Sequence, residues 1–437
     1  MRQNIKAAAS KFFESTKNKT ITVISHFDTD GITSAAIMAK TLTKLKKRFS
    51  LKIIKQLEPY IFDKINGEVV VFLDLGSSNL EKISRLGKEV FIIDHHEIPA
   101  RTEIPTNITI VNPEINKSGE ISASGLTYLF CKELNQNSYQ ELAKLAIIGM
   151  VGDMLDKEIS KLNNDILKDA EVIVKKGLML YPATRPINKA LEFSSSFYIP
   201  GVTGNSKGVF DLLTEAGITK EGNTFKSLLE LNDEEMSRLL TCILLRKKDN
   251  SEIIGNIYLI RFFNKLEDAR ELSAMINACS RLGNSDIALA LCLNNKKARE
   301  KAEEIYAEYK QQIIQALNFV EQNKIVGKGY VIINAKNIIK DTIIGTVMSI
   351  LSTSQVYPAG TIIIGLAYDE DKIKVSARVC GRDGRNVREV LELATKEIPE
   401  TECGGHHFAA GCLIKRNFES NFMDKLTKAL EIEVVKI

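Results

Sequence analysis

The stretch ITVISHFDTDGITS, residues 21–34, decides the fold that this chain can adopt. Its first part, residues 21–25, is apolar and mostly β-branched, which predicts a buried strand. His26, Asp28 and Asp30 follow that strand directly. In an open α/β sheet, ligands bind beyond the carboxyl ends of the strands, so these side chains stand where such a fold carries out its chemistry. An acidic turn that caps a helix is the alternative interpretation of this stretch alone.

The same design recurs downstream, where two apolar strand candidates and one apolar helix end are followed by acidic or imidazole side chains. Carboxylates that share a site repel one another, and a divalent cation removes that cost. Hard oxygen ligands together with imidazoles suit manganese, magnesium or zinc, and the lack of cysteine in the set disfavours a softer metal. The side chains concerned are Asp74 after residues 69–73, Asp94, His95 and His96 after residues 89–93, and Asp153 after IIGMVG.

The chain has only five histidines, and all of them lie in motifs of this kind. Two of them, His406 and His407, belong to CGGHHFAAG, residues 403–411. Small residues on both sides predict a glycine-rich loop whose backbone N–H groups can approach an anion, with imidazole donors beside them. A tight glycine turn between packed elements is the alternative for this motif.

Strands and helices alternate in the first part of the chain, which predicts a parallel, doubly wound α/β sheet. Apolar helices follow, of which the last is predicted over residues 161–177. Prolines and glycines recur within residues 181–208, and we place a domain boundary there. Residues 209–290 mix helix and strand, and alternation resumes from residue 327, with a last strand near 431–436. The predicted strands of the first part are 21–25, 51–55, 69–74, 89–94 and 107–111, and its helices are 32–47, 79–86, 122–135 and 138–152.

Residues 295–324 are rich in charged side chains, and apolar side chains recur among them at Ile305, Tyr309, Ile313 and Leu317. That spacing predicts a connecting helix with one apolar face.

Length and composition describe an ordinary globular protein of two or three domains. The chain has 437 residues and a formal net charge of +4, an excess too small to identify a nucleic-acid partner. Seven cysteines form no CxxC pair, which favours reduced thiols over a zinc site or a disulfide framework. No apolar stretch approaches the roughly 18–20 residues that span a bilayer. We therefore expect a cytoplasmic protein without a membrane partner.

These motifs, in this order and spacing, resemble the DHH phosphoesterase superfamily and its companion DHHA1 domain. HFDTDG, the strand-borne Asp74, the DHH run at 94–96 and Asp153 are similar to the four DHH motifs, and GGHHFAAG is similar to the DHHA1 motif. Cys403 departs from the family, which often has a third glycine there. The spacing of HFDTDG, with IPGVTGNSKG (199–208) and AMINACSRLG (274–283), resembles the archaeal RecJ-like branch.

The resemblance implies four regions and a set of roles for the site. The regions are a parallel-sheet DHH catalytic domain at 1–190, an α+β insert at 191–293, a connecting helix at 294–325 and an α/β DHHA1 substrate-binding domain at 326–437. One divalent cation is expected on His26, Asp28 and Asp74, and a second on Asp30, Asp74, His95 and Asp153. Mn²⁺ is expected, with Mg²⁺ as the alternative.

The remaining roles concern the scissile phosphate and the nucleic-acid strand. His96 is expected to face the phosphate and assist the leaving group, and Asp94 to orient the histidine pair. In the insert, Arg281, Lys247 and Lys248 are candidates for contacts with the nucleic-acid backbone, with a solvated surface as the alternative that any single lysine favours. The substrate-binding residues that the resemblance implies are Arg378, Arg382, Gly404, Gly405 and His406.

The implied function is two-metal hydrolysis of phosphodiesters, as an exonuclease that degrades single-stranded DNA or RNA to mononucleotides in replication or repair. Two alternatives stay open. One is a phosphodiesterase of short oligonucleotides or cyclic dinucleotides, whose relatives tend to lack a large insert. The other is a replisome scaffold that binds a complex of the GINS type. The direction of degradation and the choice between DNA and RNA are open as well.

Overall fold

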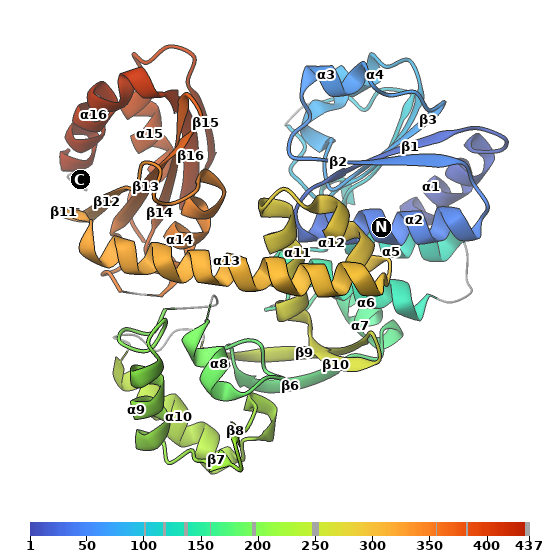
Figure 1. Cartoon of the computed structure of the whole chain (residues 1–437). Helices are drawn as coiled ribbons and strands as arrows, with labels where there is room; N and C mark the ends of the chain where they lie inside the picture. Colours follow the sequence, from blue (N-terminus) through green and yellow to red (C-terminus); the bar gives the residue numbers. More distant parts are fainter. Residues whose placement is uncertain are drawn as a thin grey trace. The chain divides into compact units, whose positions relative to one another are not determined.

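The structure is a computed structural model, and Figure 1 shows its helices and strands. It describes residues 1–99, 102–116, 119–134, 139–157, 159–194, 198–246, 253–354, 356–381 and 383–432. The chain divides into two compact units, each made of two segments. The first is Met1–Gly177 with Gly255–Tyr306, and the second is Leu178–Ile254 with Ala307–Ile437.

A five-stranded parallel sheet with the strand order β2-β1-β3-β4-β5 forms the centre of the first unit. The strands alternate with helices, and β3 is buried along its whole length, because helices cover both faces of the sheet. This arrangement confirms the α/β fold class that the sequence predicts. The elements are α1 (Arg2–Ser15), β1 (Ile21–His26), α2 (Thr29–Lys44), β2 (Phe49–Ile54), α3 (Pro59–Phe62), β3 (Val69–Leu73), α4 (Leu80–Ser84), β4 (Glu89–Ile93), β5 (Ile108–Val111), α5 (Ala123–Leu134) and α6 (Gln140–Gly152).

Two sets of helices cover the two faces of this sheet. On one face, α1, α2, α5 and α6 pack together, and the Phe12 ring meets Phe91 of β4 edge-on at 5.0 Å between centroids. On the other face, Ile61 of α3 and Ile83 of α4 join a buried cluster with Phe72 of β3. Both faces of the sheet are therefore covered by helices.

The rest of the first unit corrects one prediction. Residues 161–177 were predicted to form a single helix, but α7 (Lys161–Asp169) ends early and β6 (Ile173–Leu178) follows. Strand pairing overrides the helical pattern here, because β6 joins a sheet of order β10-β9-β6. The further elements are β9 (Ile254–Phe262), β10 (Lys265–Asp268), α11 (Ala269–Arg281) and α12 (Ser285–Cys292).

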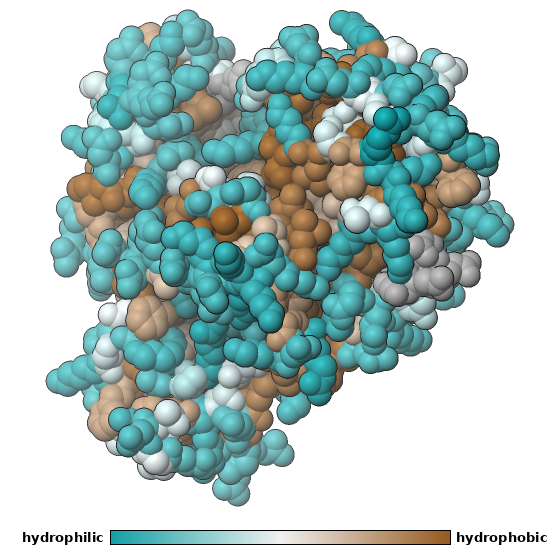
Figure 2. Space-filling model, turned by 45° about the vertical axis from the view of Figure 1, so that its right-hand side comes forward, coloured by the Kyte–Doolittle hydropathy of each residue, from teal (hydrophilic) through white to brown (hydrophobic). Residues whose placement is uncertain are grey.

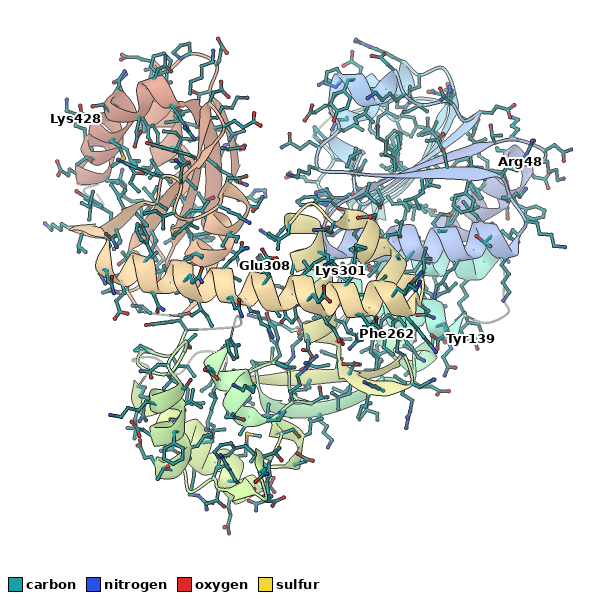
Figure 3. The ribbon with its side chains drawn as sticks, in the orientation of Figure 1. Arg48, Tyr139, Phe262, Lys301, Glu308 and Lys428 are labelled. Atoms are coloured by element: carbon teal, nitrogen blue, oxygen red, sulfur yellow. The ribbon has the colours of Figure 1, made fainter. Side chains whose placement is uncertain are left out.

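The long helix predicted near residues 295–324 is α13 (Lys296–Gln322), which begins in the first unit and continues in the second. Its predicted apolar positions, Ile305 and Ile313 among them, are buried. Lys301 and Glu308, labelled in Figure 3, are exposed. The helix is therefore amphipathic, as its sequence spacing predicts.

The second unit has a six-stranded mixed sheet of order β11-β12-β13-β14-β16-β15. Helices α15 and α16 bury side chains such as Leu391 and Phe422 against one face, and α14 contacts β13 and β14. The elements are α8 (Ile187–Glu192), α9 (Ser206–Glu215), β7 (Lys220–Glu221), β8 (Thr224–Phe225), α10 (Asp233–Arg246), β11 (Ile325–Gly327), β12 (Tyr330–Asn334), α14 (Asp341–Thr353), β13 (Ile362–Asp369), β14 (Lys372–Val379), α15 (Val387–Thr395), β15 (Glu402–His406), β16 (Ala409–Lys415) and α16 (Glu419–Glu431).

For this unit, one prediction is wrong in form, and another falls mostly outside the described residues. The motif CGGHHFAAG was predicted as a loop, but it forms a hairpin of β15 and β16 with His407 and Phe408 at its turn. A last strand was predicted near 431–436; Glu431 is the last residue of α16, and the prediction for residues 433–436 lies outside the described residues. The four domain boundaries stay predictions.

Hydrophilic residues cover much of the surface seen in Figure 2. Within the described residues, none of the helices has both the length and the apolar composition needed to cross a bilayer.

Candidate metal centre

The register of the parallel sheet brings the predicted site residues to one edge. Ser25 pairs with Leu73, and Leu73 pairs with Ile93, so β1, β3 and β4 end level with one another. The strand order places β1 beside both β2 and β3, which is the switch point where doubly wound sheets bind their ligands. The side chains that gather there are His26 at the end of β1, Asp28 and Asp30 at the start of α2, Asp74 after β3, Asp94, His95 and His96 after β4, and Asp153 at the end of α6.

His26, Asp28 and Asp74 form the first group of close ligand atoms. His26 Nδ1 lies 2.9 Å from Asp28 Oδ2 and 3.2 Å from Asp74 Oδ2. Asp28 also caps α2, because its Oδ1 accepts a hydrogen bond from the Gly31 N–H at 3.0 Å. One imidazole nitrogen therefore lies between two carboxylates.

Asp30, His95 and Asp153 form the second group. His95 Nε2 lies 3.2 Å from Asp153 Oδ2, 3.4 Å from Asp74 Oδ1 and 4.0 Å from Asp30 Oδ2. Asp74 thus directs one oxygen to each group. Asp74 therefore lies between the two groups and faces both of them.

The start of α5 holds the carboxylate of Asp30. Its Oδ2 accepts from the Ala123 N–H at 2.6 Å, and its Oδ1 accepts from the Ser124 N–H at 2.9 Å. Two backbone N–H groups at a helix N-terminus thus fix the position of this fully buried side chain.

Two buried oxygen atoms of the cluster have no hydrogen-bond partner among the described residues. They are Asp74 Oδ1 and Asp153 Oδ2, and both face His95. A buried carboxylate oxygen without a donor is costly, whereas a cation satisfies it. The donor set of carboxylates and imidazoles therefore fits divalent cations of the hard or intermediate class.

The ionisation of the cluster shows how strongly its carboxylates repel one another. Burial, together with Asp28 and Asp30, raises the pKa of Asp74 to about 7. Burial, together with Asp30 and Asp74, raises the pKa of Asp153 to about 11. In the metal-free chain, therefore, protons take the place that a cation would fill.

The pKa values of the two imidazoles are raised as well, because the carboxylates around them favour the protonated ring. Burial alone would lower the pKa of His26, but Asp28 and Asp74 outweigh it and raise that pKa to about 10. For His95, burial is outweighed by Asp74 and Asp30, and the pKa rises to about 9. Metal binding must therefore displace protons from both histidines and carboxylates.

Asp74 stands in a strained backbone conformation. Its φ is +58°, in the left-handed region that residues other than glycine rarely adopt. Its N–H donates to the Ile93 carbonyl at 2.9 Å, which ties it to the neighbouring strand. Backbone strain of this kind is common at functional sites. Here the strained conformation directs one carboxylate toward both ligand groups.

Asp94 makes hydrogen bonds to both of the histidines that follow it. Its Oδ1 accepts from the backbone N–H of both histidines and lies 2.7 Å from His96 Nδ1, while its Oδ2 accepts from the Ser77 N–H. Burial would raise the pKa of Asp94, but His96 and Ser77 outweigh it and lower the pKa to about 2. His96 is half exposed, and with Nδ1 engaged its Nε2 remains for proton exchange.

Sequence reasoning missed two residues that hold the start of α2. Asn277 Oδ1 accepts from the Thr29 N–H at 3.1 Å, and the Ser273 carbonyl accepts from Thr29 Oγ1 at 2.9 Å. Both lie on α11, nearly 250 residues from the ligands that they support. Asn277 belongs to the stretch AMINACSRLG, which points to the family, but no spacing rule predicts a contact between segments so far apart in the sequence.

We expect Asn277→Ala to weaken Mn²⁺ binding by roughly tenfold, the scale on which supports of metal ligands act. The reason is that Thr29 lies between Asp28 and Asp30, so loss of its hydrogen bond loosens both carboxylates. Titration calorimetry of the metal-free protein measures this, with Asn323→Ala, an exposed asparagine at the end of α13, as the matched control. A lower melting temperature with unchanged Mn²⁺ affinity would assign Asn277 a purely structural role.

The predicted substrate-binding residues lie in the second unit. Arg378 donates through Nε to Ser349 Oγ at 3.0 Å and through Nη1 to the Ala377 carbonyl at 2.8 Å, so its guanidinium is held in place. Gly404, Gly405 and His406 are on β15, which is the edge strand of its sheet.

Gly405 is required by this hairpin. Its φ is +119°, and a Cβ there would stand 2.4 Å from the Ala409 carbonyl oxygen. Arg281 is the last residue of α11. Arg382, Lys247 and Lys248 lie outside the described residues.

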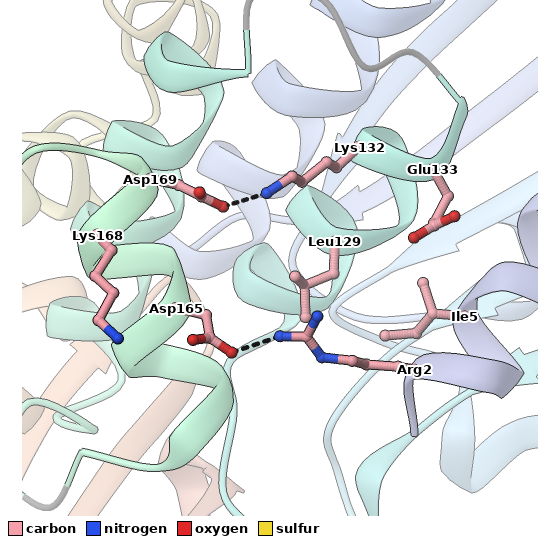
Figure 4. A pocket seen from close by; sticks show the side chains of 8 residues that line it. All are labelled: Arg2, Ile5, Leu129, Lys132, Glu133, Asp165, Lys168 and Asp169. Atoms are coloured by element: carbon pink, nitrogen blue, oxygen red, sulfur yellow. Dashed lines mark hydrogen bonds and ion pairs between the residues drawn. The ribbon is translucent and has the colours of Figure 1, made fainter.

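A separate hollow of about 290 Å³ in the first unit contains none of the predicted site residues (Figure 4). Arg2 pairs with Asp165 there, and Lys132 pairs with Asp169 at 2.5 Å. Because three basic and three acidic side chains line the hollow, it offers a phosphate little net charge.

Three family models match successive parts of the chain. They are described as the DHH family N-terminal domain at residues 20–150, the DHH-CID domain at 180–253 and the DHHA1 domain at 327–435. An uncharacterized protein of Methanocaldococcus jannaschii is 28% identical over 430 residues, which cover 94% of this chain and 93% of the relative. A putative single-strand DNA-specific exonuclease from the SPbeta prophage of Bacillus subtilis is 24% identical, over 74% of this chain and 59% of the relative.

Solved structures share the fold at low sequence identity. Exonuclease RecJ bound to manganese aligns with a TM-score of 0.64 and 17% identity, over 98% of this chain and 95% of that one. CDC45 from Entamoeba histolytica aligns with a TM-score of 0.70 and 13% identity, over 98% and 99% of the two chains. At these sequence identities, the likeness to the two solved structures shows a shared fold alone.

Proposed function

We propose, because this chain belongs to the DHH/DHHA1 family of metal-dependent phosphoesterases, that it is an exonuclease of single-stranded nucleic acid. The observation that carries the proposal is the convergence of two imidazoles and four carboxylates on one sheet edge, with Asp74 between the two groups. The two oxygen atoms without hydrogen-bond partners support the further proposal of two bound cations.

The cations would supply an activated water and would offset the negative charge of the phosphate. We propose Mn²⁺ as the resident ion, with Mg²⁺ able to replace it. His26, Asp28 and Asp74 would hold one ion, and Asp74, Asp30, His95 and Asp153 would hold the other.

The other residues of the chain would position the strand and transfer the proton. His96, oriented by Asp94, would give a proton to the leaving oxygen. Arg378, Arg382 and His406, with the glycines at 404 and 405, would bind phosphates of the strand. Mononucleotide products, a role in replication or repair, and a cytoplasmic location belong to the same proposal.

Single-stranded nucleic acid is favoured over very short oligonucleotides by the region between the two family domains. That region contains the DHH-CID match at residues 180–253, whereas the resemblance implies that phosphodiesterases of short oligonucleotides tend to lack a large insert. The likeness to exonuclease RecJ and to the putative single-strand DNA-specific exonuclease of the prophage supports the same choice.

A replisome scaffold is the second candidate, favoured by the likeness to CDC45 over nearly the whole of both chains. A GINS-type partner belongs to that candidate. The intact set of ligands argues against a purely structural role, because a chain without catalysis has no use for buried carboxylates that repel one another.

End-labelled single strands of DNA and RNA, incubated with Mn²⁺ or Mg²⁺ and sampled early, test the proposal. Release of mononucleotides from one end, with a duplex of the same sequence resistant, is the expected result. Cleavage restricted to oligomers of two to five residues would favour the oligonucleotide phosphodiesterase. Absence of hydrolysis with every divalent ion would favour the scaffold.

We expect His96→Ala to lower kcat by roughly 10²–10⁴-fold, the usual range for loss of a general acid, while Mn²⁺ affinity stays nearly unchanged. The reason is that His96 Nδ1 is already bonded to Asp94, which leaves the Nε2 atom of the ring to act on the substrate. Single-turnover kinetics and calorimetry measure the two quantities. Because His96 also lies close to Asp74 and His95, a parallel loss of Mn²⁺ affinity would make it a metal ligand instead.

A further inference from the structure

Two cysteines face each other across the β15–β16 hairpin. Cys403 pairs with Cys412 in the antiparallel register, and the closing pair of the hairpin is His406 with Ala409. Only two residues separate that closing pair, so it must be the pair that exchanges backbone hydrogen bonds. Such pairs alternate with pairs that are not hydrogen-bonded, which places Cys403 and Cys412, three steps away, at a position of the second kind.

That position suits a disulfide. Residues of a pair that is not hydrogen-bonded have Cα atoms about 4.5 Å apart, within the roughly 4.4–6.8 Å range of natural disulfides. The side chains of a directly opposed pair project from the same face of the sheet. Here both thiols lie against the core that α15 covers, and Thr395 Oγ1 of that helix lies 3.2 Å from Cys403 Sγ.

The two thiols differ in exposure and in acidity. Cys403 is partly exposed on an edge strand, while Cys412 and the other five cysteines are buried. Hydrogen bonding with Cys412 and Thr395 outweighs burial and lowers the pKa of Cys403 to about 6, whereas the pKa of Cys412 is raised. Cys403 is therefore the thiol that reagents reach first, and Cys412 is the buried thiol that lies next to it.

We propose that Cys403 and Cys412 form a dithiol modification site, which a low-molecular-weight disulfide oxidises to a reversible cross-strand disulfide. The Cys403 thiolate attacks one sulfur of the reagent, forms a mixed disulfide and releases one thiolate. Cys412 then loses its proton to solvent or to that thiolate, attacks Cys403 Sγ and releases the second thiolate. In the net reaction, two protein thiols are oxidised and one reagent disulfide is reduced to two thiols.

The bond would link the strands beside Gly404, on the hairpin that carries His406. Since β16 also pairs with β14, the bond would tie an edge strand to the interior of the sheet. The edge strand could then part from its neighbour only when the bond is reduced.

Oxidised glutathione added to the full reduced chain tests the proposal. After the reaction, free thiols are alkylated and the digested protein is mapped by mass spectrometry. The expected result is a linked peptide pair containing Cys403 and Cys412, with the other five cysteines alkylated, and with reversal by dithiothreitol. Free alkylated thiols at both positions, or links between other cysteines, would overturn the proposal.

Two single variants test the order of events. In Cys412→Ser, the glutathione adduct should remain on Cys403, at least about tenfold more abundant than in the wild type, because the resolving thiol no longer acts from close by. In Cys403→Ser, position 412 should stay unmodified, and Cys279→Ser is the matched control that keeps the linked pair. A glutathione adduct that stays on Cys403 of the wild type, without conversion to the linked pair, would overturn the proposal even if a variant fails to fold.

Discussion

Asp74→Asn should abolish Mn²⁺-dependent hydrolysis and yet leave the metal-free protein at least as stable as the wild type. The Asp74 carboxylate stands between both ligand groups, so its loss affects both proposed ions at once. Loss of a group that only supports a metal ligand typically costs about 10–100-fold, and we expect loss of a shared ligand to exceed about 100-fold in kcat. Asparagine keeps the shape of the side chain, and it removes a charge that Asp28 and Asp30 oppose.

The stability part of this prediction separates a ligand from an ordinary core residue. Melting temperatures in EDTA at pH 8 compare the variant with the wild type, and Asp369→Asn, an exposed carboxylate at the end of β13, is the matched control. A variant that hydrolyses single strands at the wild-type rate would remove Asp74 from the metal site. A variant that is inactive but strongly destabilised in EDTA would show that Asp74 supports the fold instead.

Mn²⁺ should stabilise the protein by an amount that grows with pH. An ion present at about 100 times its dissociation constant adds about 2.7 kcal/mol per site to the free energy of unfolding. For a domain of the size of the first unit, this corresponds to a rise in melting temperature of at least about 5 °C. Differential scanning calorimetry with Mn²⁺ or EDTA, from pH 6 to pH 8.5, measures the rise.

The sign of the pH dependence follows from the pKa values of the metal-free cluster. The pKa of Asp74 is about 7 and that of Asp153 about 11, both above the ordinary value of about 3.9, so the folded chain keeps protons that the unfolded chain has lost. The free energy of unfolding therefore falls as the pH rises from about 4 through these values.

The two histidines act in the same direction at neutral and higher pH. Their raised pKa values, about 10 for His26 and about 9 for His95, give stability that is complete below about pH 6.5 and is lost as the pH rises through the folded values. Metal binding must displace these protons, so its stabilising effect should increase from pH 6 to pH 8.5. A rise in melting temperature that is constant, or that shrinks with pH, would contradict the predicted cluster.

The sequence predicts this cluster well because parallel strands impose the geometry. Apolar strands of similar length, each followed by Asp or His, must end at one edge once they pair in parallel. The structure adds the level register of Ser25, Leu73 and Ile93 and the position of β1 beside β3. The ligand groups thus follow from the local pattern and from one rule of sheet topology.

The features that sequence reasoning missed depend on contacts between distant segments. β6 was taken as the end of a helix because its strand pairing with β9 lies about 80 residues away. The glycines of CGGHHFAAG suggested a loop, since they conceal the pairing of β15 with β16. The hydrogen bond from Thr29 to Asn277 joins two helices that no local pattern connects.

Diffraction from a crystal of the chain soaked in Mn²⁺, recorded for the anomalous signal of manganese, tests the central claim most directly. The account predicts two manganese peaks at the edge of the parallel sheet, one bound by His26 and Asp28, the other by His95 and Asp153, with Asp74 bound to both. Manganese held only elsewhere, or side chains of these five residues turned away from any ion, would contradict it.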